Sequence, residues 1–315
     1  MAQGTDPSRY EAGSETMNPP AETLLREAVP LVGKVPKILW IYWDSGFETA
    51  PWLVRGVLER WRECLGTEWK IVALTRHEVE EYIDIPMRKE IFEKLAKAHQ
   101  ADLIRVALLE RYGGLWSDAT VWCHRRPESW LPKWMESGFF AFEKPSEGRA
   151  VSNWFLAAEP DHYIVRRLRE EFSSFFETYR FPEPGPLRRF FIKKMIRRIE
   201  RRGVKATKIW FSPLMTRFLK VYPYFTFHYL FNYLLEKDVT FADYWNRTPK
   251  VASVPLHRLK RHGLMQAPDR EIVAVMRDAS LPLFKLDWKN LPSQPAEGSL
   301  AELLFRRDFT EKGVI

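Results

Sequence analysis

The stretch from Ala101 to Trp122 constrains the fold of this chain more than any other part of its sequence. Its first half contains no helix breaker, and apolar residues recur every three or four positions, which predicts a helix. Gly113 follows at the position where many helices end on a residue with positive φ. Residues 115–122 are rich in aromatic and β-branched side chains, which predicts a strand. Asp118 is therefore expected at the end of a buried strand, directly after the helix.

Two charged residues on the predicted helix share one of its faces. Asp102 and Arg105 are three positions apart, a spacing that brings side chains together on a helix surface. By itself such a pair would be a surface ion pair, worth less than about 1 kcal/mol. Its position one helix before two glycines and Asp118 favours a binding site instead.

The rest of the chain alternates between predicted strands and helices. This order predicts an α/β fold, in which helices cover both faces of a sheet. Ligands of such folds bind beyond the carboxyl ends of the strands, and the turns after Trp43 and at Asp118 both fall there. Trp40 is predicted to be a core residue. Strands are predicted at 35–43, 69–74, 138–143 and 151–158, and helices at 51–64, 76–82, 87–99, 161–179, 187–203, 222–235 and 300–305.

Composition limits the class of protein. A chain of 315 residues with 45% hydrophobic residues can form one large domain with a substantial core, with or without an appendage. Its two cysteines, Cys64 and Cys123, give no disulfide framework and have no metal-ligand partners at useful spacing. A reducing compartment is therefore expected.

The positive charge of the chain is concentrated in residues 187–203. This segment contains eight Lys and Arg residues and one acid, Glu200, so it carries +7 of the formal net charge of +8. Leu187, Phe191 and four further apolar residues fall on one face of the predicted helix, and most of the bases lie opposite. This pattern is typical of a helix that lies on an anionic membrane surface. The alternative is a helix packed on the core, with a solvated basic face.

Targeting signals are absent from the sequence as given. Residues 1–23 are polar and lack the apolar centre of a secretory signal, and no run approaches the roughly 18 apolar residues of a membrane span. We therefore expect a cytoplasmic protein, held peripherally at the inner face of the membrane if residues 187–203 bind lipid.

The motif around Asp118 resembles that of a known enzyme family. Asp-x-x-Arg followed by Gly113-Gly114-Leu-Trp-Ser-Asp118-Ala-Thr120 is similar to the motif of nucleotide-sugar-dependent glycosyltransferases of the GT-A type. It looks most like the capsular polysaccharide synthesis protein family. More distantly it resembles initiating mannosyltransferases and the glucosyltransferase domains of clostridial toxins. The resemblance covers roughly residues 34–290.

This resemblance implies a domain organisation. Residues 31–290 would form a GT-A-like (Rossmann-like) domain, with a mixed sheet flanked by helices. An additional helical segment, basic and aromatic, would be inserted at 180–250. Residues 1–30 would be a disordered or short helical extension, and 291–315 a peripheral C-terminal tail.

The resemblance also implies roles for individual residues. Asp102 and Arg105 would bind the hydroxyls of the donor sugar, and Lys285 would hold a phosphate oxygen. For Asn153, either a ligand hydroxyl or a backbone group could be the partner. The implied catalytic residues are Asp118, Asp102 and Arg105, and the implied donor-binding residues are Trp43, Asp102, Arg105, Trp116, Asn153, Trp154 and Lys285.

A divalent cation, Mn²⁺ or Mg²⁺, would stabilise the diphosphate that leaves during transfer. Asp118, Thr120 and His257 are its implied ligands. Thr120 stands where related motifs have a second acid, which makes the metal requirement weaker than for a full Asp-x-Asp motif.

The implied function is transfer of a sugar, with retention of configuration, from a nucleotide sugar such as a UDP-sugar. The acceptor would be a polysaccharide or lipid-linked glycan of the capsule or cell surface. Two alternatives stay open. The basic segment could belong to a polyanion- or nucleic-acid-binding protein, although no nucleic-acid-binding fold accompanies it and we expect no nucleic-acid partner. Thr120 could instead mark a catalytically inactive relative.

Overall fold

The structure is a computed structural model that describes residues 18–182 and 185–306. Its central sheet contains β3 (Ile38–Tyr42), β4 (Lys70–Leu74), β5 (Gly114–Asp118), β7 (Phe139–Ser146) and β8 (Arg149–Ala158). The strand order is β4-β3-β5-β8-β7. β3 pairs in parallel with both β4 and β5, whereas β8 is antiparallel to β5 and β7. The sheet is therefore mixed, as predicted.

Two small sheets flank the central one. β1 (Pro30–Val32) pairs with β2 (Val35–Pro36), and β6 (Val121–Cys123) pairs with β9 (Leu283–Lys285). The strand predicted at 115–122 is thus two strands, β5 and β6, separated by a turn at Ala119 and Thr120. This turn changes the direction of the chain directly after Asp118, and β9 joins it from far along the sequence.

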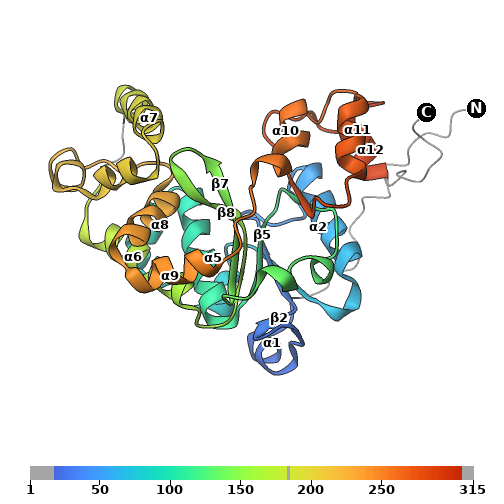
Figure 1. Cartoon of the computed structure of the whole chain (residues 1–315), viewed down its shortest axis with the longest axis horizontal. Coiled ribbons are helices and arrows are strands. Elements are labelled where there is room, and N and C mark those ends of the chain that lie inside the picture. Colours follow the sequence, from blue (N-terminus) through green and yellow to red (C-terminus); the bar gives the residue numbers. More distant parts are fainter. Residues whose placement is uncertain (1–17, 183–184, 307–315) are drawn as a thin grey trace, which may run out of the picture.

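Helices cover both faces of the central sheet (Figure 1). On one face lie α5 (Lys97–Tyr112), α6 (Tyr163–Thr178), α8 (Thr226–Lys237) and α9 (Val239–Arg247), and on the other lie α2 (Trp52–Leu65), α10 (Arg258–His262), α11 (Arg270–Arg277) and α12 (Leu300–Arg306). Alternate residues of a strand serve alternate faces, so Trp40 contributes to one core and Leu39 to the other. This architecture confirms the predicted α/β class and is consistent with a GT-A-like fold.

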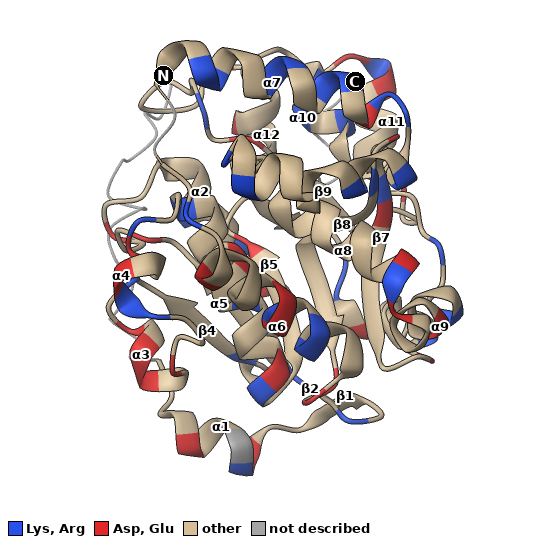
Figure 2. Cartoon of the chain, turned by 90° about the vertical axis from the view of Figure 1, so that its left-hand side faces the viewer, with Lys and Arg blue, Asp and Glu red and all other residues tan. Residues whose placement is uncertain are grey.

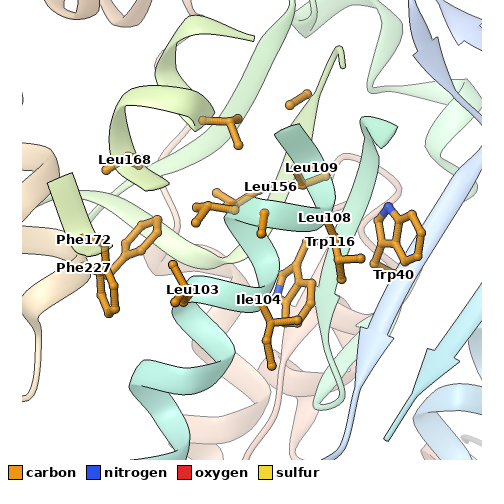
Figure 3. Close-up of a cluster of buried hydrophobic side chains, with 14 of the residues drawn as sticks. Trp40, Leu103, Ile104, Leu108, Leu109, Trp116, Leu156, Leu168, Phe172 and Phe227 are labelled. Carbon is orange, nitrogen blue, oxygen red and sulfur yellow. The ribbon is translucent and has the colours of Figure 1, made fainter. Parts of the chain in front are cut away.

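The α5 helix is buried on nearly all sides, between the sheet and the α6 and α8 helices (Figure 3). Leu103, Ile104 and Leu108 lie among Trp40 and Phe227 in this core. Trp40 is fully buried, as predicted, and its indole Nε1 donates to the carbonyl of Gly113 at 2.9 Å. A helix enclosed in this way must pair any charge that it carries.

The two glycines after α5 allow the chain to pass directly from helix to strand. Gly113 has φ of 68° and Gly114 has φ of 90°, values that side chains strongly disfavour. A Cβ on Gly114 would also lie 2.6 Å from the carbonyl oxygen of Ile38 on the neighbouring strand. Glycine at both positions therefore sets where β5 begins, and hence where Asp118 ends it.

The remaining described elements are short or lie in the predicted helical segment. That segment has a small core of its own, which includes Ile196, Ile199 and Trp210. None of the helices in the described parts of the chain is both long and apolar enough to cross a bilayer. The short or inserted elements not yet given are α1 (Ala21–Glu27), α3 (Val79–Tyr82), α4 (Lys89–Phe92), α7 (Pro186–Glu200) and the 3₁₀ or π turns η2 (Gly66–Glu68), η3 (Pro127–Ser129), η4 (Pro132–Trp134), η5 (Val204–Phe211), η6 (Leu214–Phe218) and η7 (Val254–His257).

The two ends of the described chain pack against the domain. The N-terminal extension, expected to be disordered or a short helix, contains α1, and the Asn18 side chain before it bonds both backbone groups of Ala73 at 2.9 Å; residues 1–17 lie outside the described part. The tail is not peripheral where it is described, since Leu300 and Leu304 of α12 are buried in the second core. The predicted helix at 87–99 is α4 followed by the first turn of α5.

Candidate active site

Six of the predicted site residues form one continuous network of hydrogen bonds and ion pairs. It joins side chains from α5, β5 and the turn after β5 with side chains from β8 and β9, which are distant in sequence, at the carboxyl end of β5. In order, the network contains Asn153, Asp102, Arg105, Asp118, Lys285 and Thr120. Hereafter we call these six residues the charge network.

Asp118 is the centre of the charge network. Its Oδ1 accepts hydrogen bonds from Arg105 Nη2 and Trp116 Nε1, both at 3.1 Å, and its Oδ2 accepts one from Lys285 Nζ at 2.7 Å. Burial by itself would raise the pKa of Asp118, but the positive charges of Lys285 and Arg105 outweigh it and hold the pKa below its ordinary value. The side chain is 28% exposed. Asp118 is therefore an ionised carboxylate that a ligand can approach from solvent.

Asp102 and Arg105 are buried, so they are not the surface ion pair that their spacing alone would suggest. The Asp102 carboxylate pairs with Arg105 and accepts a hydrogen bond from Asn153 Nδ2 at 2.8 Å. Burial raises the pKa of Asp102 to about 6, against the lowering effect of Arg105. The partner of Asn153, left open between a ligand and a backbone group, is thus a carboxylate of the site itself.

Lys285 reaches the network from the far end of the described chain. Its Nζ donates to Asp118 Oδ2 and to Thr120 Oγ1, both at 2.7 Å. Pairing of β9 with β6 places Lys285 opposite Val121, and the backbone N of Leu286 donates to the carbonyl of Thr120 at 2.8 Å. Backbone hydrogen bonds therefore fix the position of the ammonium group over the turn after β5.

The three predicted metal ligands do not fit a resident divalent cation. Asp118 and Thr120 both accept from Lys285, whose ammonium lies between them. A dication and an ammonium roughly 4 Å apart would repel by about 8 kcal/mol at an effective dielectric constant of about 20. In residues 18–182 and 185–306, no group of three or more His, Cys, Asp or Glu side chains could hold a metal ion. Dependence on Mn²⁺ or Mg²⁺ stays a prediction from the resemblance.

An aromatic pair lies beside the charge network. Tyr42, the last residue of β3, is paired with Asp118, so Trp43 follows at the same edge of the sheet. Trp43 packs edge-on against Trp288, with ring centroids 5.3 Å apart, and Trp288 is 38% exposed. The predicted donor-binding residue Trp43 is therefore at the expected edge, with a second tryptophan that the sequence did not indicate as a partner.

Trp154 and His257 lie outside the charge network. Successive strand residues point to opposite faces, so Trp154 points away from its neighbour Asn153. It stacks on Phe142 at 5.1 Å and contacts His257 edge-on at 5.8 Å. Burial and then the charge of Lys285 lower the pKa of His257 to about 4, so the imidazole is neutral at pH 7.

The structure places further residues beside the charge network that were not among the predicted site residues. The guanidinium of Arg105 stacks over Phe227 at 5.7 Å, and burial together with the charges of Asp102 and Asp118 raises the pKa of Tyr224. His99 is buried, and its Nε2 is 3.1 Å from the Tyr224 carbonyl oxygen. The many aromatic residues at 222–235 are the only feature of the sequence that could have indicated Tyr224 and Phe227. Their helical periodicity, however, predicts only that they belong to the core.

Several buried polar atoms in and near the network have no hydrogen-bond partner among the described residues, and four of them bear on ligand binding. Leaving such an atom unbonded costs about 1–3 kcal/mol, so buried polar atoms are normally bonded to protein, water or ligand. All four belong to side chains that could donate to or accept from a bound molecule. They are Arg105 Nε, Trp154 Nε1, His228 Nδ1 and His257 Nε2.

Comparison with known proteins gives a family match and several glycosyltransferase relatives. A family model described as "Capsular polysaccharide synthesis protein" matches residues 26–202. This range includes Asp102, Arg105 and Asp118 but ends before His257 and Lys285, which the fold brings to the site. Among curated proteins, the chain is 27% identical over 161 residues to the O-glycosyltransferase braB of Annulohypoxylon truncatum, a match that covers 45% of this chain and 38% of that protein.

Two further relatives carry similar names. The O-glycosyltransferase PaGT of Phomopsis amygdali is 28% identical over 155 residues, covering 43% of this chain and 38% of the relative. The probable glycosyltransferase FCK3 of Fusarium pseudograminearum is 34% identical over 151 residues, with the same coverage of 43% and 38%. The chain therefore spans less than half the length of these relatives. No solved structure gave a significant match.

Proposed function

The chain belongs to the capsular polysaccharide synthesis protein family, whose model covers more than half of its 315 residues, and from this premise we propose that it is a glycosyltransferase. The donor is a nucleotide sugar, bound at the carboxyl end of β5. The observation that carries the proposal is the charge network, in which two acids and two bases are held together and the central carboxylate, Asp118, is partly exposed.

The positive members of the network suit the leaving group of such a reaction. When a sugar leaves its nucleotide, negative charge develops on the diphosphate, and fixed positive donors stabilise that charge most when they are already in place. Lys285 has three N–H groups and uses two of them on Asp118 and Thr120. Arg105 Nε is also unbonded within the described residues. Lys285 can therefore donate to a phosphate oxygen without breaking an existing bond, and Arg105 Nε can donate to an oxygen of the donor sugar.

The inner part of the network suits the sugar. Asp102 is an acceptor for hydroxyl groups, and Arg105 and Asn153 hold its carboxylate in one orientation. The partly exposed Trp43 and Trp288 rings supply a flat apolar surface on which a nucleobase can stack. In this arrangement the sugar lies over α5, the diphosphate at Asp118 and Lys285, and the base against the tryptophans.

The remaining features of the reaction are part of the proposal and rest on the resemblance. The nucleotide is UDP, the anomeric configuration is retained, and the acceptor is a polysaccharide or lipid-linked glycan of the capsule or cell surface. The enzyme works in the cytoplasm, at the inner face of the membrane.

Donor hydrolysis tests the proposal without a guess about the acceptor. The purified chain should release free sugar from at least one member of a panel of UDP-, GDP- and CDP-sugars, and Asp118→Ala should not. Asp84→Ala is the matched control, because Asp84 is an exposed carboxylate outside the site. Failure to bind or hydrolyse any nucleotide sugar, with or without Mn²⁺, would reduce the chain to an inactive relative. Strong heparin binding in that case would favour the polyanion-binding alternative.

A further inference from the structure

We propose that the Lys285 ammonium takes the place of a divalent cation, and that this chain transfers its sugar without a bound metal ion. The inference rests on the proposed function, because it assigns the charge that stabilises the departing diphosphate. It starts from a disagreement between the resemblance, which implies Mn²⁺ or Mg²⁺, and the geometry of the three residues implied as ligands.

The position of Lys285 is the first observation. Its Nζ is 2.7 Å from an oxygen of Asp118 and 2.7 Å from the oxygen of Thr120, the two positions of the Asp-x-Thr motif. A cation bound by that motif would contact the same two oxygens. The ammonium is therefore where the metal would be, and it is held there by β9 backbone pairing rather than by a flexible loop.

The charge of the motif agrees with this substitution. Thr120 supplies a neutral oxygen where a second acid would add a negative charge, so the motif carries one negative charge instead of two. One ammonium neutralises it, whereas a dication would leave an excess positive charge next to Lys285 and Arg105. The four charged members of the network, Asp102, Arg105, Asp118 and Lys285, sum to zero before the donor binds.

The transfer step balances without a metal. The bond between the anomeric carbon and the diphosphate oxygen breaks, and its electron pair stays on that oxygen. A bond forms between the anomeric carbon and the acceptor oxygen, and the acceptor proton passes to the departing phosphate. Lys285 stays protonated and donates its third N–H to the phosphate, while Arg105 stays paired with Asp118.

Nucleotide affinity with and without chelator tests this inference. For the wild-type chain we expect the dissociation constant for UDP, measured by titration calorimetry, to change less than twofold between EDTA and Mn²⁺. Donor hydrolysis should likewise survive EDTA. A loss of UDP affinity of tenfold or more in EDTA, restored by Mn²⁺, would overturn the inference but leave the proposed function intact. Absence of nucleotide binding in both buffers would overturn the proposed function itself.

Substitution of Lys285 provides a second test of the metal-free inference. Lys285→Ala should weaken UDP binding at least tenfold in EDTA and regain part of it with Mn²⁺, because the oxygens of Asp118 and Thr120 are then free for a metal. Lys260→Ala is the control: this lysine pairs with Asp287 outside the network and should leave UDP affinity unchanged. If Lys285→Ala binds UDP like the wild type, the inference fails. If it does not fold, the wild-type comparison decides alone.

A second, independent observation concerns the outer surface of the helical segment. The apolar side chains predicted on one face of 187–203 are divided. Ile192, Met195, Ile196 and Ile199 pack on the small core, whereas Leu187, Phe190 and Phe191 face solvent. Phe190 is 61% exposed and Leu187 is 71% exposed. The helix is thus both core-packed on one side and apolar at the outer side of its first turns.

The neighbouring η6 turn extends this exposed apolar surface. Phe218 is 79% exposed, and Leu214 and Leu219 are exposed beside it. The Arg188 guanidinium donates to the carbonyls of Leu219 and Lys220, which fastens the start of α7 to the end of η6. We call this combined area the α7–η6 surface; its apolar members are Leu187, Phe190, Phe191, Leu214, Phe218 and Leu219.

Basic residues surround the α7–η6 surface. Figure 2 shows Lys and Arg along α7, which Figure 1 shows at the outer side of the helical layer. The one acid of the segment, Glu200, pairs with Arg149 at 3.0 Å. Within the described residues, none of the eight bases of 187–203 forms an ion pair. Exposed aromatic and aliphatic side chains among unneutralised bases match the interface of an anionic bilayer, which offers phosphate charge above an apolar interior.

We infer that the α7–η6 surface docks on an anionic lipid bilayer. Sedimentation with vesicles tests this. The wild-type chain should bind vesicles that contain a third phosphatidylglycerol, binding should fall with salt, and neutral phosphatidylcholine vesicles should bind it at least tenfold more weakly. Replacing Arg197, Arg198, Arg201 and Arg202 by Glu should abolish binding. Reversing four exposed bases far from α7, at Arg26, Lys34, Lys89 and Lys94, is the matched control and should leave most of it.

The apolar members provide a test that separates lipid from other polyanions. Replacing Phe190 and Phe218 by Ser should weaken vesicle binding at least fivefold but leave heparin binding unchanged, because heparin has no apolar interior. Equal loss of both, or no loss of either, would overturn insertion into lipid. A wild-type chain that stays in the supernatant with anionic vesicles at low salt would overturn docking altogether.

Discussion

The charge network and the α7–η6 surface use the same kinds of charged residue in opposite ways. In the network, Asp102, Arg105, Asp118 and Lys285 are buried or nearly so, and each charge has a partner within about one hydrogen-bond length. On α7, all the bases except the half-buried Arg188 are exposed, and within the described residues none of them has an ion-pair partner. Burying a charge is costly unless it is paired, whereas an exposed charge costs almost nothing to keep in water.

This difference determines how each region should respond to mutation. Removing one member of a buried network leaves its partner charged and unpaired, so a single substitution has a large effect. Removing one of eight solvated bases changes only a fraction of a summed attraction. A single substitution in the charge network should therefore abolish most of the activity. Successive substitutions on the α7–η6 surface should reduce activity gradually, and only in assays that contain a membrane.

The largest effect should come from Asp118→Ala. The change leaves Lys285 and Arg105 without their shared carboxylate, and Lys285 loses the orientation that aims it at the diphosphate. We expect kcat/KM for donor hydrolysis to fall on the order of 10³-fold or more, while the circular dichroism spectrum stays that of the wild type. A variant that keeps more than about a tenth of wild-type turnover would remove Asp118 from the mechanism.

Arg105→Ala and Asp102→Ala should separate the sugar from the nucleotide. Because these residues lie deeper than Asp118, on α5, we expect them to contact the donor sugar more than UDP. Donor hydrolysis should fall roughly a hundredfold, and the affinity for UDP less than tenfold. Titration calorimetry and hydrolysis kinetics on the same preparations give the two numbers. An equal fall in both would place these residues at the nucleotide instead.

Acid should weaken the network before it weakens the fold. The pKa of Asp102 is about 6, so below that pH the side chain takes up a proton and loses the charge that orients Arg105 and Asn153. We expect kcat/KM to fall about tenfold per pH unit below pH 6. In Asp102→Asn this limb should vanish. If kcat/KM of Asp102→Asn falls below pH 6 as it does for the wild type, the group that titrates is not Asp102.

The pH dependence of stability has the opposite sign at this residue. A carboxyl whose pKa is higher in the folded than in the unfolded chain holds its proton more firmly when folded. The contribution of Asp102 to the free energy of unfolding therefore declines as the pH rises from about 4 to about 6. A loss of activity as the pH falls from about 6 to about 4 would therefore not be due to unfolding driven by protonation of Asp102.

The smallest effect on chemistry should come from the α7–η6 surface. Replacement of Arg197, Arg198, Arg201 and Arg202 by Glu should change hydrolysis of a soluble donor less than twofold, since none of these residues contacts the charge network. With a membrane-bound acceptor the same variant should lose most of its activity. If the variant keeps the same fraction of wild-type activity in both assays, the α7–η6 surface does not bring the enzyme to a membrane-bound acceptor.

The part of the site that could be predicted from the sequence is the part that is local in the chain. Asp102, Arg105, Gly113 and Asp118 lie within one helix, one turn and one strand, so periodicity and the glycine pair were sufficient to order them. Lys285 was assigned only through resemblance. Its contact with Asp118 depends on pairing of β9 with β6 across 167 positions, which no local pattern encodes.

The errors have a common physical origin. A helical wheel identified the apolar residues of α7 but could not show that the rest of the protein covers only the half near Ile196 and leaves Phe190 exposed. The C-terminal tail at 291–315, which contains α12, was likewise expected at the periphery. Its Phe305 ring lies against Gly56, where a Cβ would approach it to 2.0 Å, so the tail packs into space that a glycine on α2 leaves open.

A crystal structure with UDP would test the central claim most directly. We predict that the diphosphate lies within hydrogen-bond distance of Lys285 Nζ, at the carboxyl end of β5, with the uracil ring against Trp43 or Trp288 and no metal ion between the phosphates and Asp118. UDP bound with its phosphates away from both Asp118 and Lys285 would contradict the assignment of the charge network as the donor site.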